Sequence, residues 1–464
     1  MSVLSRVYDW LDDQIGIRSA ILPVIVHPVP KDVNWWYIFG SATLTSFIIQ
    51  AVTGVALAFA YVPSPNAAYD SLDYITNQAF LGSVIRGVHY FNASAMVILI
   101  TIHMIRVFLM AAYKYPRQLT WLIGVFLLIL TLGMAFTGQL LRWNQDAYWA
   151  VFVMAEQAAR APILGPFIAR VIIAGSTVGG TTLTRFYATH VFLIPALMFG
   201  LIGAHLYLIV RNGISELPKA GQPVNPKTYK RWYDDLIHRD GIPFWPDAAW
   251  RDVVFALVVG AVVVVLAVVV GPPDLGAKAD PTNLVADPRP DWYFLWLFSM
   301  LALMPRSIED AMILIVPLAL LVALLAVPFI SPAGERSPRR RPWAIATVVV
   351  GLLASAVLIQ RGQTATWSPN FEPQPLPAAI TTGLSPTALQ GAQLFQVKGC
   401  LNCHLIAGSG GLRGPDLTTV GSRLRPDQLT WRILNGGENM PAYGSALKPD
   451  ELQAIVEFLS TRLK

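Results

Sequence analysis

The sequence predicts an all-α membrane protein, with a bundle of seven transmembrane helices followed by a small α-helical soluble domain. Of its 464 residues, 54% are hydrophobic and 13% are charged, and the mean hydropathy is +0.51. Soluble globular domains carry about 25% charged residues, so this composition excludes a soluble enzyme, a coiled coil and a disordered chain. The net charge of +6 does not indicate nucleic acid binding, because the basic residues are spread between apolar segments.

Seven apolar segments carry the fold prediction. A membrane-spanning helix needs roughly 20 apolar residues, and helices are expected over 35–61, 83–111, 121–140, 183–210, 253–270, 311–330 and 343–359. With the N-terminus inside, the connections on that side hold 15 Lys or Arg and those on the other side hold 6. The positive-inside rule therefore places Met1 in the cytoplasm. Because seven is odd, everything after Ile359 is expected outside.

The chain changes character after the seventh segment. Residues 361–382 are rich in Pro, Thr and Gln, which predicts an extended linker. Residues 383–464 are Gly-rich and predict a small soluble domain whose last helix covers about 449–463.

Four of the seven histidines form two matched pairs within the predicted membrane helices. His89 and His103 are 14 residues apart in the second helix, and His190 and His205 are 15 apart in the fourth. At about 1.5 Å per residue, each pair spans roughly 21 Å. Fifteen residues overshoot four turns by about 60°, which a local bulge or a tilt of the helix could absorb. A lone membrane histidine often serves a helix–helix hydrogen bond. Two matched pairs instead favour two bis-imidazole haems, one at each surface.

Glycines recur at the same interval in the neighbouring helices. Gly40 and Gly54 are 14 apart in the first helix, and Gly124 and Gly138 are 14 apart in the third. Glycine lets a flat macrocycle lie against a helix backbone. Each haem would thus receive one glycine from each flanking helix, although ordinary small-residue helix contacts also use glycine.

Two arginines stand beside the histidines. Arg86 precedes His89 by three residues, and Arg106 follows His103 by three. Each lies toward an aqueous end of its helix, where it could pair with a haem propionate. Snorkelling to the membrane surface is the alternative.

Several motifs resemble cytochrome b. They are Asp32-Val-Asn-Trp-Trp-Tyr, Ile85-Arg-Gly-Val-His89, Leu119-Thr-Trp-Leu-Ile-Gly124 and Thr182-Leu-Thr-Arg-Phe-Tyr-Ala-Thr-His190. The histidine spacing of 15 resembles cytochrome b6, and Phe244-Trp-Pro, Ala279-Asp-Pro and Val327-Pro-Phe resemble subunit IV of the b6f complex. The resemblance implies a cytochrome b bundle, with a di-haem four-helix domain over 1–217 and a three-helix domain over 218–360. The b6f complex has these parts as two chains, whereas here they are fused.

The connection before the sixth span holds the expected quinol site. Pro290-Asp-Trp-Tyr stands where the family has Pro-Glu-Trp-Tyr, whose carboxylate is thought to take a proton from quinol at the outer face. The resemblance implies Asp291 as the base and Tyr293 as a shaping or hydrogen-bonding group. Asp in place of Glu shortens the reach by one methylene. The alternative is that the Asp291 carboxylate caps the helix that begins at Trp292.

The other walls of the quinone sites match the family less closely. After the third span, Tyr148 and Trp149 match an aromatic pair, while Arg142 and Asn144 replace the usual Pro and Asp. For quinone reduction at the inner face, the candidates are Arg211 by position and Asp32 and Asp247 by topology. Ile38 stands where cytochrome b6 has a cysteine that anchors an extra covalent haem, so no such haem is expected here.

The soluble domain carries the two cysteines of the chain in a Cys-x-x-Cys-His motif. Cys400 and Cys403 would add to the haem vinyl groups, and His404 would bind the iron. A zinc site would need more ligands. Met440 is the only methionine after Cys403 and is expected as the second axial ligand. Gly391-Ala-Gln-Leu-Phe395, Gly414-Pro-Asp-Leu417 and Phe458 resemble class I cytochrome c. Bacteria attach haem c outside the cytoplasm, which agrees with a periplasmic domain on a cytoplasmic membrane protein.

These motifs predict the core of a quinol:cytochrome c oxidoreductase of the bc1/b6f type with two haem b and one haem c. Quinol would be oxidised near Asp291, and one electron would cross the bilayer through both b haems to an inner quinone. The other electron would pass through a separate Rieske iron–sulfur protein to the c haem, with proton translocation. No Rieske ligand set (two Cys and two His in one domain) exists in this sequence. The resemblance also implies a homodimer and a downstream cytochrome c or oxidase.

Three other functions share some of these motifs. A di-haem anchor of another redox complex would explain the histidines but not the last three spans or the Pro-Asp-Trp-Tyr connection. The same enzyme run in reverse, to reduce quinone, has the same sequence features. A membrane-tethered carrier on an inactive scaffold is disfavoured by the intact set of four histidines.

Overall fold

The computed structural model describes residues 3–16, 18–19, 22–175, 178–280, 289–364, 376–410, 414–436, 440–444 and 446–462. Seven of the described helical segments are long and apolar enough to cross a membrane. They are α3 (Phe39–Ala58), α5 (Gly82–Leu109), α6 (Gln118–Leu140), the continuous α9–η3–α10, α12 (Trp250–Val269), α14 (Arg306–Ile330) and α15 (Pro342–Thr364). The predicted all-α class and all seven spans are confirmed.

The spanning helices expose apolar side chains, as expected for helices surrounded by lipid. On α12, Val265, Val268 and Val269 are 56%, 62% and 76% exposed. Water would make such a surface unfavourable, whereas lipid tails accommodate it. The chain is a multi-pass membrane protein.

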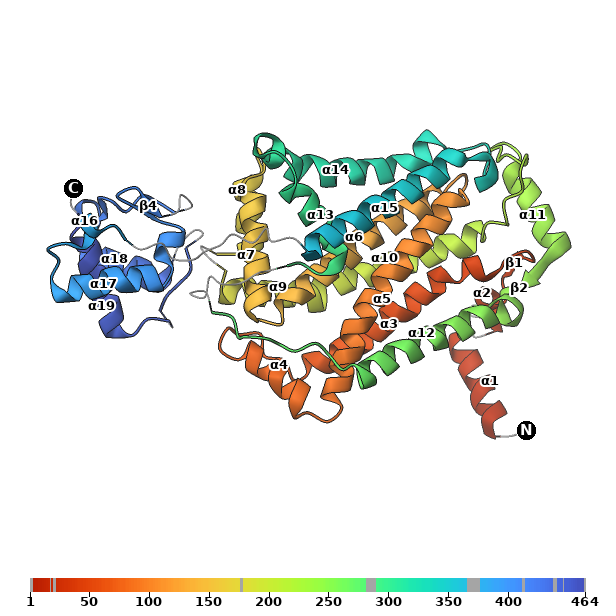
Figure 1. The fold of residues 1–464 in the computed structure, drawn as a ribbon. Helices are drawn as coiled ribbons and strands as arrows, with labels where there is room; N and C mark the ends of the chain where they lie inside the picture. The colour runs from red at the N-terminus through yellow and green to blue at the C-terminus, as the bar shows by residue number, and fades with distance from the viewer. Residues whose placement is uncertain are drawn as a thin grey trace.

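In the middle of the bundle, α3 lies against α5 and α6 lies against α10. On one side α12 packs on α3 and α5, and on the opposite side α14 packs on α6 (Figure 1). A shorter apolar helix, α13 (Trp292–Ala302), packs on α15.

The fourth span contains a local bulge, one of the two ways in which its histidine spacing could be accommodated. A π-helical turn, η3 (Thr189–Leu193), joins α9 (Gly180–Ala188) to α10 (Ile194–Asn212). A π-turn takes one more residue than an α-turn. Because His190 lies within it, the 15-residue interval to His205 is accommodated in one continuous helix.

The two ends of the bundle carry different short elements. The end at His89 has α4 (Ala68–Asn77), α7 (Gln145–Ala159), α8 (Gly165–Ile173) and α13. The end at His103 has α1 (Val3–Ile15), α2 (Leu22–Ile25), η2 (Trp35–Tyr37), α11 (Tyr229–Asp240), η4 (Phe244–Ala248) and η5 (Pro338–Arg340). There β1 (Pro28–Pro30) pairs antiparallel with β2 (Gly241–Pro243), with Val29 opposite Ile242.

The C-terminal domain is small and mostly helical. Its elements are α16 (Ala378–Thr381), α17 (Pro386–Val397), η6 (Cys400–Asn402), β3 (Leu405–Ile406), β4 (Ser409–Gly410), η7 (Val420–Ser422), α18 (Pro426–Asn435) and α19 (Pro449–Ser460). The buried rings of Phe395 on α17 and Phe458 on α19 meet at 5.7 Å between centroids. The predicted last helix is therefore present and ends at Ser460.

The seventh span delivers this domain to the His89 end. At the start of α15, Arg341 donates to the carbonyls of Phe108 and Leu109 at the His103 end of α5. Near the end of α15, Gly362 lies against Ser299 and Leu295 of α13. In Figure 1 the C-terminal domain accordingly lies beyond α7, far from α11.

Candidate functional site

The first pair of membrane histidines faces across the bundle. The ring centroids of His89 on α5 and His190 on η3 are 6.4 Å apart, with an interplanar angle of 73°. Two metal–imidazole bonds of about 2 Å, with each nitrogen about 1 Å from its ring centre, separate collinear rings by about 6 Å. The observed separation therefore suits two axial ligands of one metal ion.

Each ring of this pair is oriented by a threonine on a neighbouring helix. Oγ1 of Thr53 lies 2.9 Å from Nδ1 of His89, and Oγ1 of Thr137 lies 3.0 Å from Nδ1 of His190. Both hydroxyls already donate to a backbone carbonyl four residues earlier, so they accept from the Nδ1–H groups. This selects the tautomer whose Nε2 is free to bind metal.

The four predicted glycines each lie against one of the four histidines. A Cβ atom added to the glycine would stand 2.7–3.6 Å from Cε1 of the imidazole. The pairs are Gly40 with His103, Gly54 with His89, Gly124 with His205 and Gly138 with His190. Each end of the bundle thus has one glycine from α3 and one from α6, as the 14-residue intervals predict.

The second pair, His103 on α5 and His205 on α10, lies at the other end of the bundle, backed by Gly40 and Gly124. Arg106 lies over the ring of Tyr37, with its guanidinium carbon 3.6 Å from the centroid. The Arg106 side chain is buried, and its Nε and Nη2 atoms have no hydrogen-bond partner among the described residues. Unsatisfied buried donors of this kind are costly unless an anion binds there. A haem propionate fits that requirement.

The His89 end has a related but different set of donors. Arg86 is buried and donates to Oγ1 of Thr76 and to the carbonyl of Pro273, so it ties α4 and the segment after α12 to α5. Nε2 of Gln139 is buried without a partner among the described residues. The donors at both ends, together with the glycine-backed imidazoles, fit a haem at each end.

Asp291 and Tyr293 form a hydrogen-bonded pair beside the first histidine pair. Oη of Tyr293 donates to Oδ2 of Asp291 at 2.8 Å. The Asp291 side chain makes no capping bond to α13, so the helix-cap alternative is wrong. Nε1 of Trp292 donates to Oγ of Ser94, five residues beyond His89 on α5. This bond ties the start of α13, which carries the pair, to α5 near His89.

Aromatic side chains close the wall between this pair and His190. Phe294 contacts Phe136 on α6 at 6.4 Å between centroids, two residues before Gly138. Tyr148 and Trp149 are 2% and 8% exposed and belong to the apolar cluster that packs α7 against the bundle. Asn144 caps α7 by accepting from the backbone N–H of Ala147 and also donates to the carbonyl of Leu275.

A pocket opens at the His103 end between η2, α12 and the segment after α10. Its polar lining consists of Asn34, Tyr37, Arg251 and Asp252, and Ile38 forms part of its apolar wall. Oγ of Ser41 donates to Oδ1 of Asp252. Burial raises the pKa of Tyr37, opposed by the charge of Arg106, so its phenol remains a neutral donor. The pocket offers both a carboxyl group and a phenol to a carbonyl compound.

Sequence reasoning missed this polar lining. The signal was the charged pair Arg251-Asp252 at the start of an otherwise apolar span. Arg211 is instead exposed and donates to Oη of Tyr207. Oδ2 of Asp32 accepts from the backbone N–H of Leu217. Arg211, Asp32 and Asp247 do not line the pocket.

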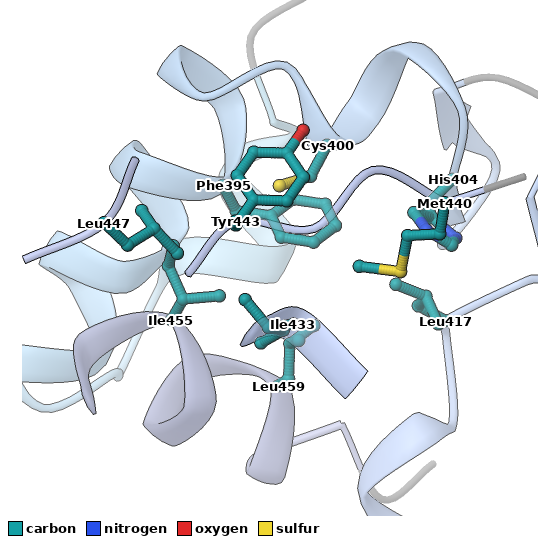
Figure 2. A pocket seen from close by; sticks show the side chains of 10 residues that line it. All are labelled: Phe395, Cys400, His404, Leu417, Ile433, Met440, Tyr443, Leu447, Ile455 and Leu459. Carbon is teal, nitrogen blue, oxygen red and sulfur yellow. The ribbon is translucent and has the colours of Figure 1, made fainter. Parts of the chain in front are cut away.

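Three of the predicted c-haem residues, Cys400, His404 and Met440, line one pocket of the C-terminal domain (Figure 2). Cys400 and His404 come from the segment that begins at η6, Met440 comes from the segment after α18, and Phe395 lies in the apolar wall. Nδ1 of His404 bonds the carbonyl of Pro415 at 2.9 Å, which leaves Nε2 for a metal. Burial lowers the pKa of His404, opposed by that bond, so the imidazole stays in its neutral, metal-binding form.

Comparison with known proteins agrees with this geometry. Residues 24–213 match the family profile "Cytochrome b/b6/petB" and residues 278–373 match "Cytochrome b(C-terminal)/b6/petD". Cytochrome b6 of Heliobacterium modesticaldum is 43% identical over 210 residues, which is 45% of this chain and 99% of that protein. The chain belongs to the cytochrome b family.

Further similarities support both parts of this cytochrome b chain. The cytochrome b subunit of Bacillus subtilis menaquinol:cytochrome c reductase is 37% identical over 222 residues, or 46% of this chain and 99% of that protein. A solved structure described as hyperthermophilic respiratory Complex III has a TM-score of 0.64 and 28% identity, covering 77% of this chain and 91% of that one. Residues 386–459 match "Cytochrome C oxidase, cbb3-type, subunit III". The C-terminal domain is a cytochrome c domain.

Proposed function

We propose that this chain is the cytochrome b of a quinol:cytochrome c reductase or b6f-like complex, fused to its own cytochrome c. The observation that carries the proposal is the set of four histidines, arranged as two pairs, each imidazole backed by a glycine. When bound, two haem b groups would supply one-electron redox centres roughly 21 Å apart along the helices, and one haem c would supply a third. His89 with His190, and His103 with His205, would hold the b haems.

Neighbouring side chains set the histidine tautomers and leave hydrogen-bond donors free before any cofactor binds. Thr53 and Thr137 fix the tautomers of His89 and His190, so no proton has to leave when Nε2 takes a metal. Arg106 keeps two buried N–H donors available for an acidic group. The propionates of a haem supply such groups, and Arg86 and Gln139 would serve at the opposite end.

Quinol oxidation is assigned to the His89 end, where Asp291 is the group able to accept a proton. Its carboxylate is fixed beside α5 by the neighbouring Trp292–Ser94 bond and is not engaged as a helix cap. The contact of Phe294 with Phe136 gives an apolar wall where α13 meets α6. Quinol held against that wall would lose its proton to Asp291.

Quinone reduction is assigned to the pocket at the His103 end. Asp252, paired with Ser41, would donate a proton to one quinone carbonyl, and Tyr37 or Arg251 would bind the other. This places proton uptake and proton release at opposite ends of the bundle. Arg211 is left with a surface role beside Tyr207.

In the cytochrome c domain, Cys400 and Cys403 would attach the haem through thioether bonds, and His404 and Met440 would bind its iron. The domain follows α15 at the His89 end, on the same side as Asp291. We infer that it receives electrons there from a separate Rieske-type iron–sulfur protein and passes them to a downstream cytochrome or oxidase. The excess of Lys and Arg at the other end orients the His103 end toward the cytoplasm, and the working complex is inferred to be a homodimer.

A variant of the base tests this function in the intact complex. Asp291→Asn should lower quinol:cytochrome c reductase turnover by about 100-fold or more while haem content stays unchanged. Asp274→Asn, an exposed carboxylate in the same α12–α13 connection, is the matched control and should keep the parental rate. Full turnover in Asp291→Asn would overturn the assignment of quinol oxidation to this end.

A further inference from the structure

We propose that Tyr293 relays the quinol proton to Asp291, and so supplies the reach that the short carboxylate lacks. The inference rests on the function proposed above and gives Tyr293 a direct part in proton transfer. It concerns the pair of side chains as this chain has them, aspartate with tyrosine two residues later.

The hydrogen bond between the two side chains sets the direction of the relay. Oη of Tyr293 donates its own proton to Oδ2 of Asp291 at 2.8 Å. A phenol oxygen that donates one hydrogen bond still has lone pairs with which to accept another. A quinol hydroxyl that donates to Oη would therefore complete a chain from quinol to carboxylate.

The short side chain of aspartate favours such a chain. Aspartate is shorter than glutamate by one methylene, or about 1.5 Å, so its oxygens stay close to the backbone where α13 begins. The Tyr293 side chain is 9% exposed and its backbone lies inside the first turn of α13. Its phenol, held among the aromatic rings of Trp292 and Phe294, carries the chain further into the apolar wall.

Burial and the neighbouring charges keep the Tyr293 phenol protonated. Burial, followed by the Asp291 carboxylate, raises the pKa of Tyr293 above its ordinary value, opposed by the charge of Arg142. The phenol therefore keeps its proton and remains the donor to Asp291. Tyr90, the residue after His89, is the remaining titratable group that influences Tyr293.

The step is a proton transfer without a change of oxidation state. The quinol O–H bond breaks and its proton bonds to Oη of Tyr293, while the former Tyr293 proton bonds to Oδ2 of Asp291. The electron pair remains on the quinol oxygen, which gives the quinol monoanion. Tyr293 ends as it began, and Asp291 becomes a neutral acid. Oxidation of the anion then follows, with the iron–sulfur protein taking the first electron.

A double-mutant cycle in the full complex tests the relay. Tyr293→Phe should lower the turnover number at least about tenfold in the Asp291 background, with little change in quinol KM. In an Asp291→Glu background, whose carboxylate reaches further, the same Tyr293→Phe change should cost less than about threefold. Tyr90→Phe is the matched loss of a nearby phenol and should show no such dependence on residue 291.

Each outcome decides between relay and packing. An equal loss from Tyr293→Phe in both backgrounds, or a loss confined to KM, would mean that the phenol only shapes the site. No loss in the Asp291 background would also overturn the relay. The solvent deuterium isotope effect on turnover should be larger with Tyr293 than with Phe at this position, since two protons move. The proposed function itself fails separately, through Asp291→Asn with unchanged turnover.

Discussion

The two ends of the four-helix bundle back their histidines with glycines in the same way but surround them with different charges. The His89 end carries the acid–base pair of Asp291 and Tyr293. At the His103 end five basic side chains are almost fully buried. These are Arg106, Lys114, Arg117, Arg336 and Arg341, each 8% exposed or less.

Helix ends explain how so many cations can be buried together. Arg341 donates to Phe108 and Leu109 carbonyls and Arg336 to the Met110 carbonyl, all at the C-terminus of α5. Arg117 donates likewise at the C-terminus of α10. The partial negative charge of a helix C-terminus stabilises a cation there. The basic residues that orient the chain thus also cap the ligand-bearing helices.

The difference in buried charge between the two ends indicates at which end an added electron is better stabilised. An added electron makes a bound haem more negative, and nearby buried cations oppose that charge more effectively than exposed ones. We expect a haem at the His103 end to have a higher midpoint potential than a haem at the His89 end. The difference favours electron transfer from the quinol-oxidising end to the quinone-reducing end.

The largest expected effect is the loss of one ligand from one end. His190→Leu should halve the b-type haem content and leave the haem with the higher potential, whereas His205→Leu should leave the one with the lower potential. Turnover should fall to background in both. Pyridine haemochrome analysis with a redox titration measures content and potential together. Retention of both haems, or the same remaining potential in both variants, would break the comparison.

The next effect concerns the ion pairs of the two ends. Arg336 and Glu216 form a buried pair with side chains 3% and 12% exposed, so Arg336→Gln should lower the free energy of unfolding by about 3–5 kcal/mol. Arg160 pairs with Glu309 at the His89 end with 43% of its side chain exposed, and Arg160→Gln should cost about 0–1 kcal/mol. Thermal unfolding of the detergent-solubilised complex gives both values. Equal losses of unfolding free energy in the two variants would show that burial does not make the Arg336 ion pair stronger than the Arg160 ion pair.

The glycines give a smaller and finer test. A Cβ on Gly138 would stand 2.7 Å from Cε1 of His190, whereas a Cβ on Gly124 would stand 3.6 Å from Cε1 of His205. Gly138→Ala should therefore displace the imidazole and cost about 1–3 kcal/mol, with an altered low-temperature absorption band of one b haem. Gly124→Ala should leave the spectrum unchanged. A perturbed spectrum in Gly124→Ala alone would reverse the inferred packing.

The smallest effect is a pH dependence confined to the His103 end. Burial, with Arg341 and Arg336 nearby, lowers the pKa of Lys114 to about 8, opposed by Glu335. As pH rises through about 8, Lys114 loses its positive charge, so the midpoint potential of the nearer haem should fall. Lys114→Met should remove that part of the pH dependence and leave the His89-end haem unaffected. An unchanged slope in Lys114→Met would assign the pH dependence to other groups.

The parts of the site that follow a helical period could be predicted from the sequence. The 14-residue histidine and glycine intervals are close to four helical turns, so residues on one face follow from helix geometry. The 15-residue interval of His190 and His205 left a local bulge or a tilt open, and the structure shows the bulge. Thr53 and Thr137 could not be predicted in the same way, because a helical threonine ordinarily bonds the carbonyl four residues earlier. Their contacts with histidine appear only once neighbouring helices are placed.

The charged pair Arg251-Asp252 is a sequence signal for the pocket at the His103 end, but the segments that meet there could not be predicted, for a related reason. Asn34, Asp252 and Ile214 come from three distant segments, brought together by the β1–β2 pair and by the packing of α12 on α3. No local sequence pattern predicts that these three segments lie together. At the other end, Asp291 and Tyr293 are two residues apart, so one short motif was enough to identify them.

The number and kind of haems in the purified chain test the central claim most directly. The pyridine haemochrome spectrum should show two b-type haems for each c-type haem. A haem-stained denaturing gel should show one covalent haem that disappears in Cys400→Ser/Cys403→Ser. One b-type haem or none would contradict the two-ended bundle, and covalent haem that persists in the double variant would contradict its assignment to the cytochrome c domain.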